Sequence, residues 1–241
     1  MKKMICKTII NKALETIYPP RCALCDDIVY DGRDICFECE KKMKLPGDAV
    51  CLKCGKTLYD RGREYCKRCE KGESYFVQGK IIFEYEGDIK ESIYHFKYGN
   101  RREYAAFYAR IANEVYGDWI ERKGVELIVP VPMHKKKKRY RGYNQAEIFA
   151  KELSKLTDIR CNDVVLRLKN TKPQAKLNQE ERKNNLLNAF KIKSDIVKYK
   201  KILVIDDIFT TGSTINEIAK ELLDAGAKEV YMLCIASRRD V

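Results

Sequence analysis

Two adjacent carboxylates near the end of the chain follow a run of four aliphatic residues, in the segment ILVIDDIFTTGST of residues 202–214. The aliphatic run predicts a buried strand, and open α/β sheets bind ligands at the carboxyl ends of their strands. Neighbouring carboxylates can accept hydrogen bonds from neighbouring hydroxyl groups. We therefore expect Asp206 and Asp207 to bind a diol such as the 2- and 3-hydroxyls of a ribose.

The residues after these acids are suited to binding a phosphate. They are small or carry a hydroxyl, and they lead directly into an expected helix: Thr210, Thr211, Gly212, Ser213 and Thr214. Backbone N–H groups of small residues can approach an anion closely, and a helix N-terminus adds partial positive charge. A Walker-type loop is excluded because the chain has no GxxxxGK[ST] pattern. The alternative is an ordinary turn with two exposed acids. It is disfavoured because it does not explain why strand, acids, loop and helix occur together in this order.

Eight of the 11 cysteines form four CxxC pairs separated by 10, 11 and 11 residues. The pairs are Cys22 and Cys25, Cys36 and Cys39, Cys51 and Cys54, and Cys66 and Cys69. Two CxxC turns provide the four thiolates of a structural zinc site, so four turns predict two zinc ions. Disulfides are disfavoured in a reducing compartment, and redox-active CxxC motifs normally occur singly. The spacing favours sequential pairing, in which the first four cysteines hold one ion, and it also allows an interleaved arrangement.

The other three cysteines, Cys6, Cys161 and Cys234, are interpreted as packing residues. Gly55 follows Cys54 directly, where a zinc-binding turn needs a residue that tolerates positive φ.

These motifs lie in a chain of 241 residues with a net charge of +13 and 45% hydrophobic residues. The hydrophobic content excludes a disordered chain, and no apolar run approaches the roughly 18 residues of a membrane-spanning helix. The N-terminus lacks the uninterrupted apolar core of a signal peptide. We therefore expect a cytoplasmic protein. About two thirds of the excess charge, +9, falls in residues 71–241.

The apolar patterns predict alternating strands and helices after residue 72. Strands are expected at 79–86, 126–131, 163–168, 201–205 and 229–235, and helices at 88–97, 102–116, 144–156 and 213–223. This alternation predicts an α/β fold with a mainly parallel sheet and flanking helices. We divide the chain into an N-terminal amphipathic helix (1–20), a small double zinc ribbon with four cysteines at each site (21–72) and the α/β domain (73–241).

Three segments resemble a known family. VIDDIFTTGST resembles the phosphoribosyl pyrophosphate (PRPP) motif of type I phosphoribosyltransferases, and VPVPMHKKKKRYRGYNQAEIFAKEL and KPQAKLNQEERKNNLLNAF resemble consecutive blocks of the ComF family. Together with the double CxxC ribbon, the resemblance covers nearly the whole chain. It implies a type I phosphoribosyltransferase-like domain and an association with natural competence, in which imported single-stranded DNA enters the cytoplasm.

The resemblance also implies roles for residues. Asp206 and Asp207 would be the catalytic carboxylates that bind the ribose hydroxyls of PRPP, and residues 210–214 would bind its 5-phosphate. Candidates for the pyrophosphate, which would leave with Mg²⁺, are Arg139, Arg141 and Gly142, with Asn144 and Gln145 orienting their loop. Lys172, Pro173, Gln174 and Arg182 would form a flap over PRPP. The implied reaction is displacement of pyrophosphate from C1 by a nitrogen nucleophile, and no segment indicates which base accepts the ribose.

A basic run, HKKKKRYR, covers residues 134–141. Cations interleaved with aromatic rings suit single-stranded nucleic acid, and the candidates are Lys135, Lys136, Lys137, Lys138, Tyr140 and Tyr143. The alternative is a solvated lysine run in which only the two arginines bind pyrophosphate. His95 and His134 are each isolated in the sequence, which favours surface or packing roles.

Two functions are therefore open. One is a phosphoribosyltransferase that serves DNA uptake or nucleotide metabolism. The other is a non-catalytic adaptor that senses PRPP or a nucleotide while it binds single-stranded DNA and a competence helicase.

Overall fold

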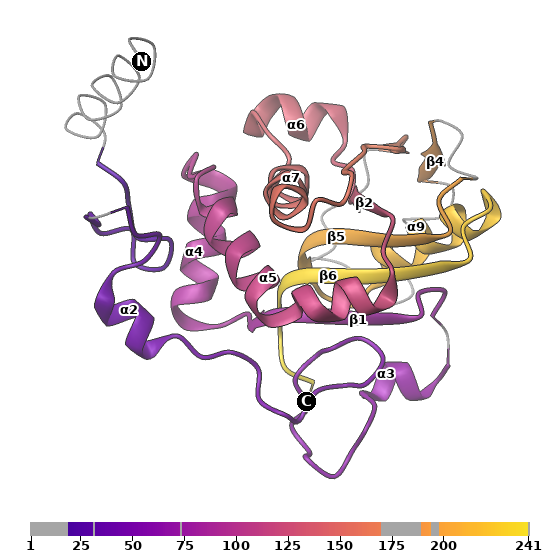
Figure 1. The fold of residues 1–241 in the computed structure, drawn as a ribbon, viewed down its shortest axis with the longest axis horizontal. Helices are drawn as coiled ribbons and strands as arrows, with labels where there is room; N and C mark the ends of the chain where they lie inside the picture. Colours follow the sequence, from indigo (N-terminus) through magenta and orange to yellow (C-terminus); the bar gives the residue numbers. More distant parts are fainter. Residues whose placement is uncertain (1–18, 31, 73, 170–188, 194–197, 241) are drawn as a thin grey trace.

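The computed structural model describes residues 19–30, 32–72, 74–169, 189–193 and 198–240 (Figure 1). The expected N-terminal amphipathic helix lies almost wholly outside these residues. The proposed flap residues, Lys172, Pro173, Gln174 and Arg182, also lie outside them.

The centre of the molecule is a four-stranded sheet in the order β1-β6-β5-β2, and all three strand pairs are parallel. The strands are β1 (Gln78–Glu84), β2 (Leu127–Pro130), β5 (Lys201–Phe209) and β6 (Glu229–Ser237). A separate antiparallel pair joins β3 (Val165–Arg167) to β4 (Phe190–Ile192). The predicted parallel α/β fold is confirmed.

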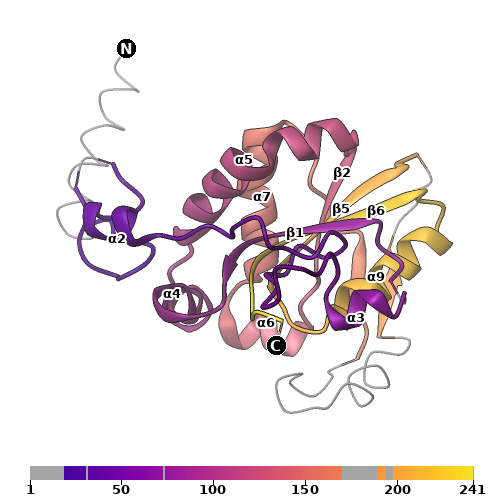
Figure 2. The same ribbon diagram turned by 90° about the horizontal axis from the view of Figure 1, so that it is seen from below.

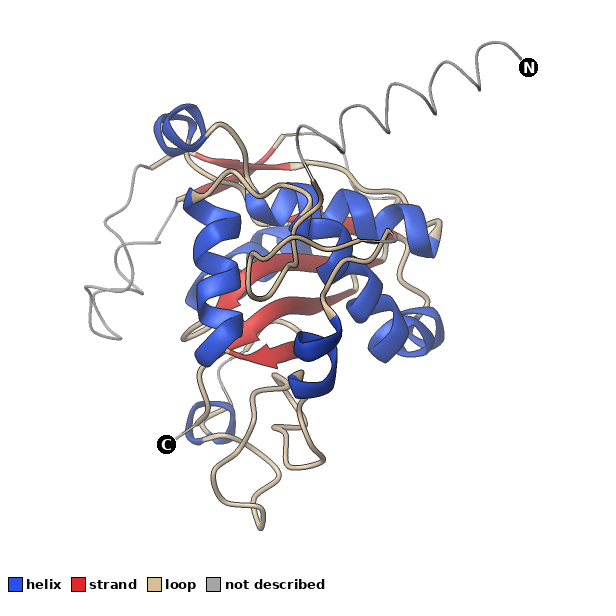
Figure 3. Ribbon diagram, turned by 90° about the vertical axis from the view of Figure 1, so that its left-hand side faces the viewer, coloured by secondary structure: helices blue, strands red, loops and turns tan. Residues whose placement is uncertain are grey.

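Helices cover both faces of the sheet (Figures 2 and 3). One face carries α4 (Gly87–Tyr98), α5 (Tyr104–Lys123) and α7 (Gln145–Thr157), and the other carries α9 (Ser213–Asp224). Successive strand residues point to opposite faces. In β5, Leu203 and Ile205 therefore belong to the core on the α5 side, while Ile202 and Val204 belong to the core on the α9 side.

Several elements differ from the sequence-based expectation, and α2 (Phe37–Lys42), α3 (Lys67–Glu70) and β4 were not predicted. β5 does not end at Ile205 but continues to Phe209, because its pairing with β6 extends to the residue pair Phe209 and Ser237. Helix α5 continues past the expected end at Tyr116 to Lys123, where Gly124 caps it with φ +63°. The basic run, expected to be part of a loop, forms helix α6 (Lys135–Arg141).

The two ribbons dock on different cores. Cys22, Ala23 and Leu24 of the first ribbon join the core on the α5 side, whereas Cys51, Cys54 and Cys66 of the second join the core beneath α9. The first ribbon carries the short helix α2 and the second carries α3. Figure 2 shows α2 standing out from the body and α3 lying near α9. Among the described residues, no helix has the length and apolar character required to cross a membrane.

Gly55 is required at the contact between the second ribbon and β1. Its φ is +74°, and a Cβ there would stand 2.8 Å from the carbonyl oxygen of Gly79 and 2.9 Å from the Cα of Lys80. The Gly79 N–H also donates to the Lys53 carbonyl at 2.7 Å. The predicted positive φ at Gly55 is confirmed, and the close backbone approach is a second reason for glycine at this position.

Candidate functional site

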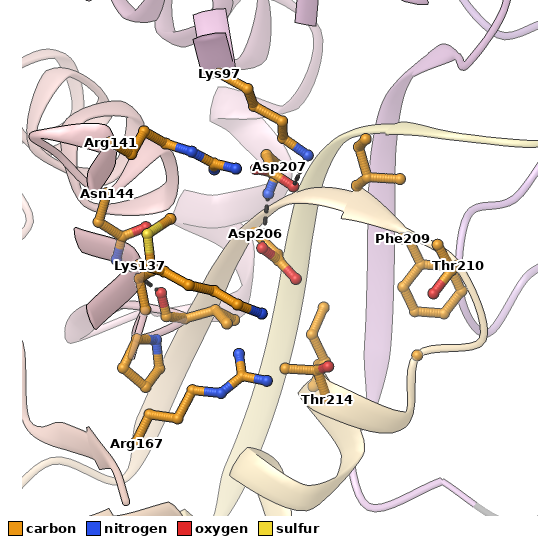
Figure 4. Close-up of a pocket in the computed structure, with 16 residues that line it drawn as sticks. Lys97, Lys137, Arg141, Asn144, Arg167, Asp206, Asp207, Phe209, Thr210 and Thr214 are labelled. Carbon is orange, nitrogen blue, oxygen red and sulfur yellow. Dashed lines mark hydrogen bonds and ion pairs between the residues drawn. The ribbon is translucent and has the colours of Figure 1, made fainter. Parts of the chain in front are cut away.

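A cavity of about 310 Å³ opens beside the Asp206–Asp207 pair (Figure 4). Its walls come from the ends of α4 and β2, from α6, from β3, and from the segment that joins β5 to α9. The residues that line it with polar or charged side chains are Lys97, Lys137, Arg141, Asn144, Arg167, Asp206, Asp207, Thr210 and Thr214. The cavity therefore brings together residues from segments that are far apart in the sequence.

The early end of β2 exposes the two acids. The last ladder contact of β2 is Pro130 with Ile205, and the Val131 N–H then donates to the Ile205 carbonyl at 2.8 Å. The chain turns away at Pro132, which has no N–H to donate. The edge of β5 from Asp206 onward is therefore left open to the cavity while its other edge stays paired with β6.

The two acids point to different sides because they are consecutive strand residues. Asp207 forms an ion pair with Lys97 of α4 at 2.9 Å. Arg167 of β3 lies on the Asp206 side, where burial raises the pKa of that carboxyl and the charges of Lys97 and Arg167 oppose part of the rise. Within the strand, the Asp207 N–H donates to Asp206 Oδ1 at 2.9 Å and fixes that carboxylate (Figure 4).

Four cations line the described part of the cavity: Lys97, Lys137, Arg141 and Arg167. Lys137 and Arg141 are four residues apart, so they share one face of α6. Arg141 donates to Gln145 Oε1 at 2.6 Å, and its guanidinium lies 4.8 Å from the centre of the Tyr98 ring. These contacts orient Arg141 at the rim of the cavity.

The pKa values of Arg167 and Lys137 indicate that the cationic side of the cavity favours an added anion, whereas the pKa of Asp206 reflects burial beside a second acid. Burial raises the pKa of Asp206 to about 7, and the charge of Asp207 adds to this effect. Burial lowers the pKa of Arg167, although the Asp206 charge opposes that shift. Burial also lowers the pKa of Lys137, aided by the charges of Arg167 and Arg141. A polyanion in the cavity would relieve this crowding of cations.

The predicted phosphate loop joins β5 to α9 at one side of the same cavity. Thr210, Gly212 and Thr214 line it, while the hydroxyls of Thr211 and Ser213 lie 2.9 Å apart and bond to each other. Gly212 caps α9 with φ +68°. The five predicted residues therefore divide into three that face the cavity and two that fix the turn.

Helix α6 places the residues predicted to bind pyrophosphate or DNA on two different faces, one toward the cavity and one toward solvent. Arg141 and Lys137 face the cavity, whereas Arg139 is exposed and does not line it. Gly142 ends α6 with φ +84°. Asn144 lines the cavity and donates to the Val131 carbonyl at 2.9 Å, as expected of a residue that orients this segment.

Tyr143 is not available to stack on a base. Its side chain is 4% exposed, and its hydroxyl donates to the Phe96 carbonyl. The sequence placed Tyr143 with the basic run because an aromatic residue next to cations gives the same sequence pattern whether its ring is exposed or buried. His134 accepts from the Lys136 N–H and caps α6, and neither His134 nor His95 lines the cavity.

Lys97 and Arg167 were not anticipated. No motif contains them, since Lys97 stands at the end of a helix and Arg167 in a short strand. Only the packing of α4 and β3 around β5 brings them to the acids.

The eight CxxC thiols form two separate groups of four, in sequential order. The groups are Cys22, Cys25, Cys36 and Cys39, and Cys51, Cys54, Cys66 and Cys69, with the sulfur atoms of each group within 4.8 Å of one another. The sulfur atoms of Cys25 and Cys36 in the first group, and those of Cys54 and Cys66 in the second, lie 3.8 Å apart. This distance matches the edge of a tetrahedron with Zn–S bonds of about 2.3 Å. Both groups therefore fit a structural zinc ion, and the sequential pairing is the one observed.

Two family models agree with this architecture. The model of the double zinc ribbon domain matches residues 13–70, and the model of the phosphoribosyl transferase domain matches residues 139–240. A solved purine phosphoribosyltransferase from Pyrococcus horikoshii aligns with 54% of this chain and 74% of its own, at 18% identity and a TM-score of 0.35.

Three curated relatives have related sequences. Competence protein F of Haemophilus influenzae is 39% identical over 46% of this chain and 50% of its own length. DNA utilization protein YhgH of Escherichia coli K12 is 30% identical over 64% of this chain and 69% of its own. Competence protein ComFC of Bacillus subtilis is 28% identical over 62% of this chain and 59% of its own. With its double zinc ribbon and its phosphoribosyltransferase-like α/β domain, the chain belongs to the ComF family.

Proposed function

We propose that the cavity binds PRPP with Mg²⁺ and supports displacement of pyrophosphate by a nitrogen nucleophile. The observation that carries this proposal is the meeting of an acid pair, a phosphate loop and four cations around one cavity. The acids suit the ribose hydroxyls, the loop suits the 5-phosphate, and the cations suit the pyrophosphate. The α/β domain, residues 73–241, would act here, and the ribbon of residues 21–72 would support it.

The charges match the expected transition state. As the bond from C1 to pyrophosphate breaks, positive charge develops on the ribose ring and negative charge on the leaving group. Asp206 and Asp207 would stabilise the ring, while Lys97, Lys137 and Arg141 would stabilise the pyrophosphate. Bound Mg²⁺ supplies further neutralisation of the leaving group, and carboxylate and phosphate oxygens are the ligands it prefers. Lys97 pairs with Asp207 in this structure, so ligand binding would exchange that ion pair for contacts of Asp207 with the ribose and of Lys97 with the pyrophosphate.

Calorimetric titration with PRPP and Mg²⁺ tests this function, followed by a pyrophosphate-release assay with a panel of nucleobases. We expect saturable PRPP binding, and release of pyrophosphate with the base that is the acceptor. Binding without release from any base would favour the sensing adaptor. Absence of PRPP binding would contradict both the transferase and an adaptor that senses PRPP, and would leave only an adaptor that senses another nucleotide.

The outer face of α6 supports a second candidate function, binding of single-stranded DNA. Lys135, Lys136 and Arg139 are exposed, and the ring of Tyr140 is 91% exposed. Lys138 is instead engaged with Glu147 at 2.6 Å. Three cations beside an exposed ring provide the phosphate and base contacts that single strands require. The competence and DNA utilization names of the relatives agree with a role in DNA handling. We propose that this role is cytoplasmic and includes a helicase partner.

Replacing Lys135, Lys136 and Arg139 together by alanine should weaken single-stranded DNA binding and flatten its salt dependence. If each cation contacts one phosphate, the negative slope of log K against log salt becomes shallower by about 2. Fluorescence anisotropy with a labelled oligonucleotide at several salt concentrations measures both quantities. The matched control removes three other exposed cations, Lys155, Lys220 and Lys228. An equal loss of affinity in the control would reduce the effect to net charge and contradict a site on α6.

A further inference from the structure

The second zinc ribbon lies directly behind the phosphate loop. Arg68, in α3, extends to Gly212, so that its Nη1 atom is 2.6 Å from the point where a Cβ on that glycine would stand. Two ring atoms of Phe209 are also 2.6 Å from the same point. The Arg68 Nη1 atom is buried. A guanidinium from the ribbon is therefore packed against the backbone of the residue that caps α9.

Other contacts join the ribbon to this loop. The Tyr75 N–H, just after the ribbon, donates to Asn216 Oδ1 in the first turn of α9 at 2.7 Å. The rings of Phe76 and Phe209 meet edge to face with centroids 6.5 Å apart. The cysteines Cys51, Cys54 and Cys66 belong to the same buried core as Phe209 and Ile215. The loop thus has the cavity on one side and the second ribbon on the other.

The position of Arg68 depends on the metal site. Arg68 lies between Cys66 and Cys69, inside the CxxC turn that supplies half of the second group. Helix α3 has only 4 residues, too few to be stable without its tertiary contacts and ligands. Binding of an ion by Cys66 and Cys69 would fix the backbone from which the arginine extends.

We propose that Arg68 is a positioning residue through which zinc in the second ribbon and a phosphate in the loop strengthen each other's binding. Its guanidinium braces Gly212 and adds a positive charge behind the loop. This inference rests on the proposed phosphate site. Because coupling between two ligands is reciprocal, zinc raises the affinity for the phosphate and the phosphate protects the zinc.

The first ribbon supplies an internal control. Its contacts go to α4, to α5 and to the segment between them instead of to the phosphate loop. The Ser92 hydroxyl donates to the Ala23 carbonyl, and Arg101 pairs with Asp26 at 2.7 Å. Zinc in the first group should therefore be insensitive to the phosphate.

Calorimetry with ribose 5-phosphate, which carries the 5-phosphate without the pyrophosphate, measures the loop alone. Arg68→Met should lower its affinity about fivefold or more, and Arg68→Lys, which keeps the charge, should retain most of it. The matched control is Arg63→Met in the same ribbon, where the arginine pairs with Glu70 at the surface at 2.6 Å. Equal affinities for Arg68→Met and Arg63→Met would overturn the inference.

Release of zinc to a chromogenic chelator tests the reciprocal effect, which a purely structural arginine would not produce. The Cys25→Ser background removes the first site and leaves the second site as the source of the signal. Ribose 5-phosphate should slow this release when residue 68 is Arg and not when it is Met. If the parent chain binds ribose 5-phosphate but releases zinc at an unchanged rate, the coupling is wrong. If it binds neither ribose 5-phosphate nor PRPP, the phosphate site itself is wrong.

Discussion

Replacing Asp206 and Asp207 together by asparagine should reduce PRPP affinity by more than about 100-fold while the protein stays folded. Each carboxylate is expected to accept a charge-assisted hydrogen bond, and such bonds contribute about 1.5–3 kcal/mol each. Calorimetry with Mg²⁺ present measures the change. The matched control is the pair Asp60→Asn and Asp163→Asn, which removes two exposed acids elsewhere. Unchanged affinity in the Asp206 and Asp207 variant would contradict the assignment of the ribose site.

The pH dependence gives a second readout of the same residues. The pKa of Asp206 is about 7 in the folded protein and 3.8 ordinarily, so folding favours the protonated acid. Its contribution to stability is complete below about pH 4 and is lost as pH rises through 7. Asp206→Asn does not titrate, so its free energy of unfolding should exceed that of the parent protein at pH 8 by on the order of 1 kcal/mol. The difference should shrink toward pH 5.

PRPP affinity of the parent protein should rise between pH 6 and pH 8, because the ionised carboxylate is the better acceptor for ribose hydroxyls. A variant that is more stable at pH 8 and yet does not bind PRPP would separate loss of binding from damage to the fold. Denaturant unfolding at pH 5 and pH 8 supplies the free energies. A less stable Asp206→Asn protein at pH 8 would contradict the burial argument.

The local parts of this site could be predicted from sequence because they lie in one segment. Asp206, Asp207 and the loop that follows are consecutive, and the strand and helix around them have strong apolar patterns. The partners of the acids are not local. Lys97 is separated from Asp207 by 110 residues. Only the strand order β1-β6-β5-β2 and the packing of α4 against it bring the two together.

Helix α6 replaces the loop that the family resemblance implied for the basic run. Cations four residues apart repel each other along a helix, so the run needs other contacts to be helical. In the structure the His134 side chain caps the helix, Gly142 ends it, and Lys138 pairs with Glu147. Lys137 and Arg141 face the cavity that contains the two acids, which offsets part of the repulsion. All but the caps are tertiary contacts that the run itself does not encode.

The ribbons likewise contribute more to the fold than their spacing suggested. The CxxC pattern predicts two metal sites, but it does not indicate that they dock on different cores. Asp26, which follows Cys25, accepts from Arg101 and from the Tyr104 hydroxyl on the α5 side. Gly55, which follows Cys54, lies against β1. The residue after the first CxxC turn of each ribbon thus contacts the body.

Loss of the second zinc site should destabilise the whole α/β body, whereas loss of the first should mainly release its own ribbon. Three cysteines of the second group are buried, and Cys54 among them has no exposed surface and packs in the core with Phe209 and Ile215, whereas the first group has two buried cysteines and an exposed Cys25. The second ribbon also holds the C-terminus, where the Asp240 N–H donates to the Thr57 carbonyl at 2.9 Å. A structural zinc ion contributes about 10–16 kcal/mol in small domains, which is as large as the total stability of most proteins.

Cys54→Ser should therefore lower the midpoint of thermal unfolding by about 10 °C or more, and Cys25→Ser by clearly less. Metal analysis should give about two zinc ions per chain for the parent protein and about one for each variant. Near-ultraviolet circular dichroism follows the aromatic core, and limited proteolysis follows the first ribbon. Cys161→Ser, which removes a partly buried thiol outside both groups, controls for loss of a sulfur atom. Equal destabilisation by Cys25→Ser and Cys54→Ser would contradict this prediction. It would mean that both ribbons stabilise the sheet equally, whichever core each one packs against.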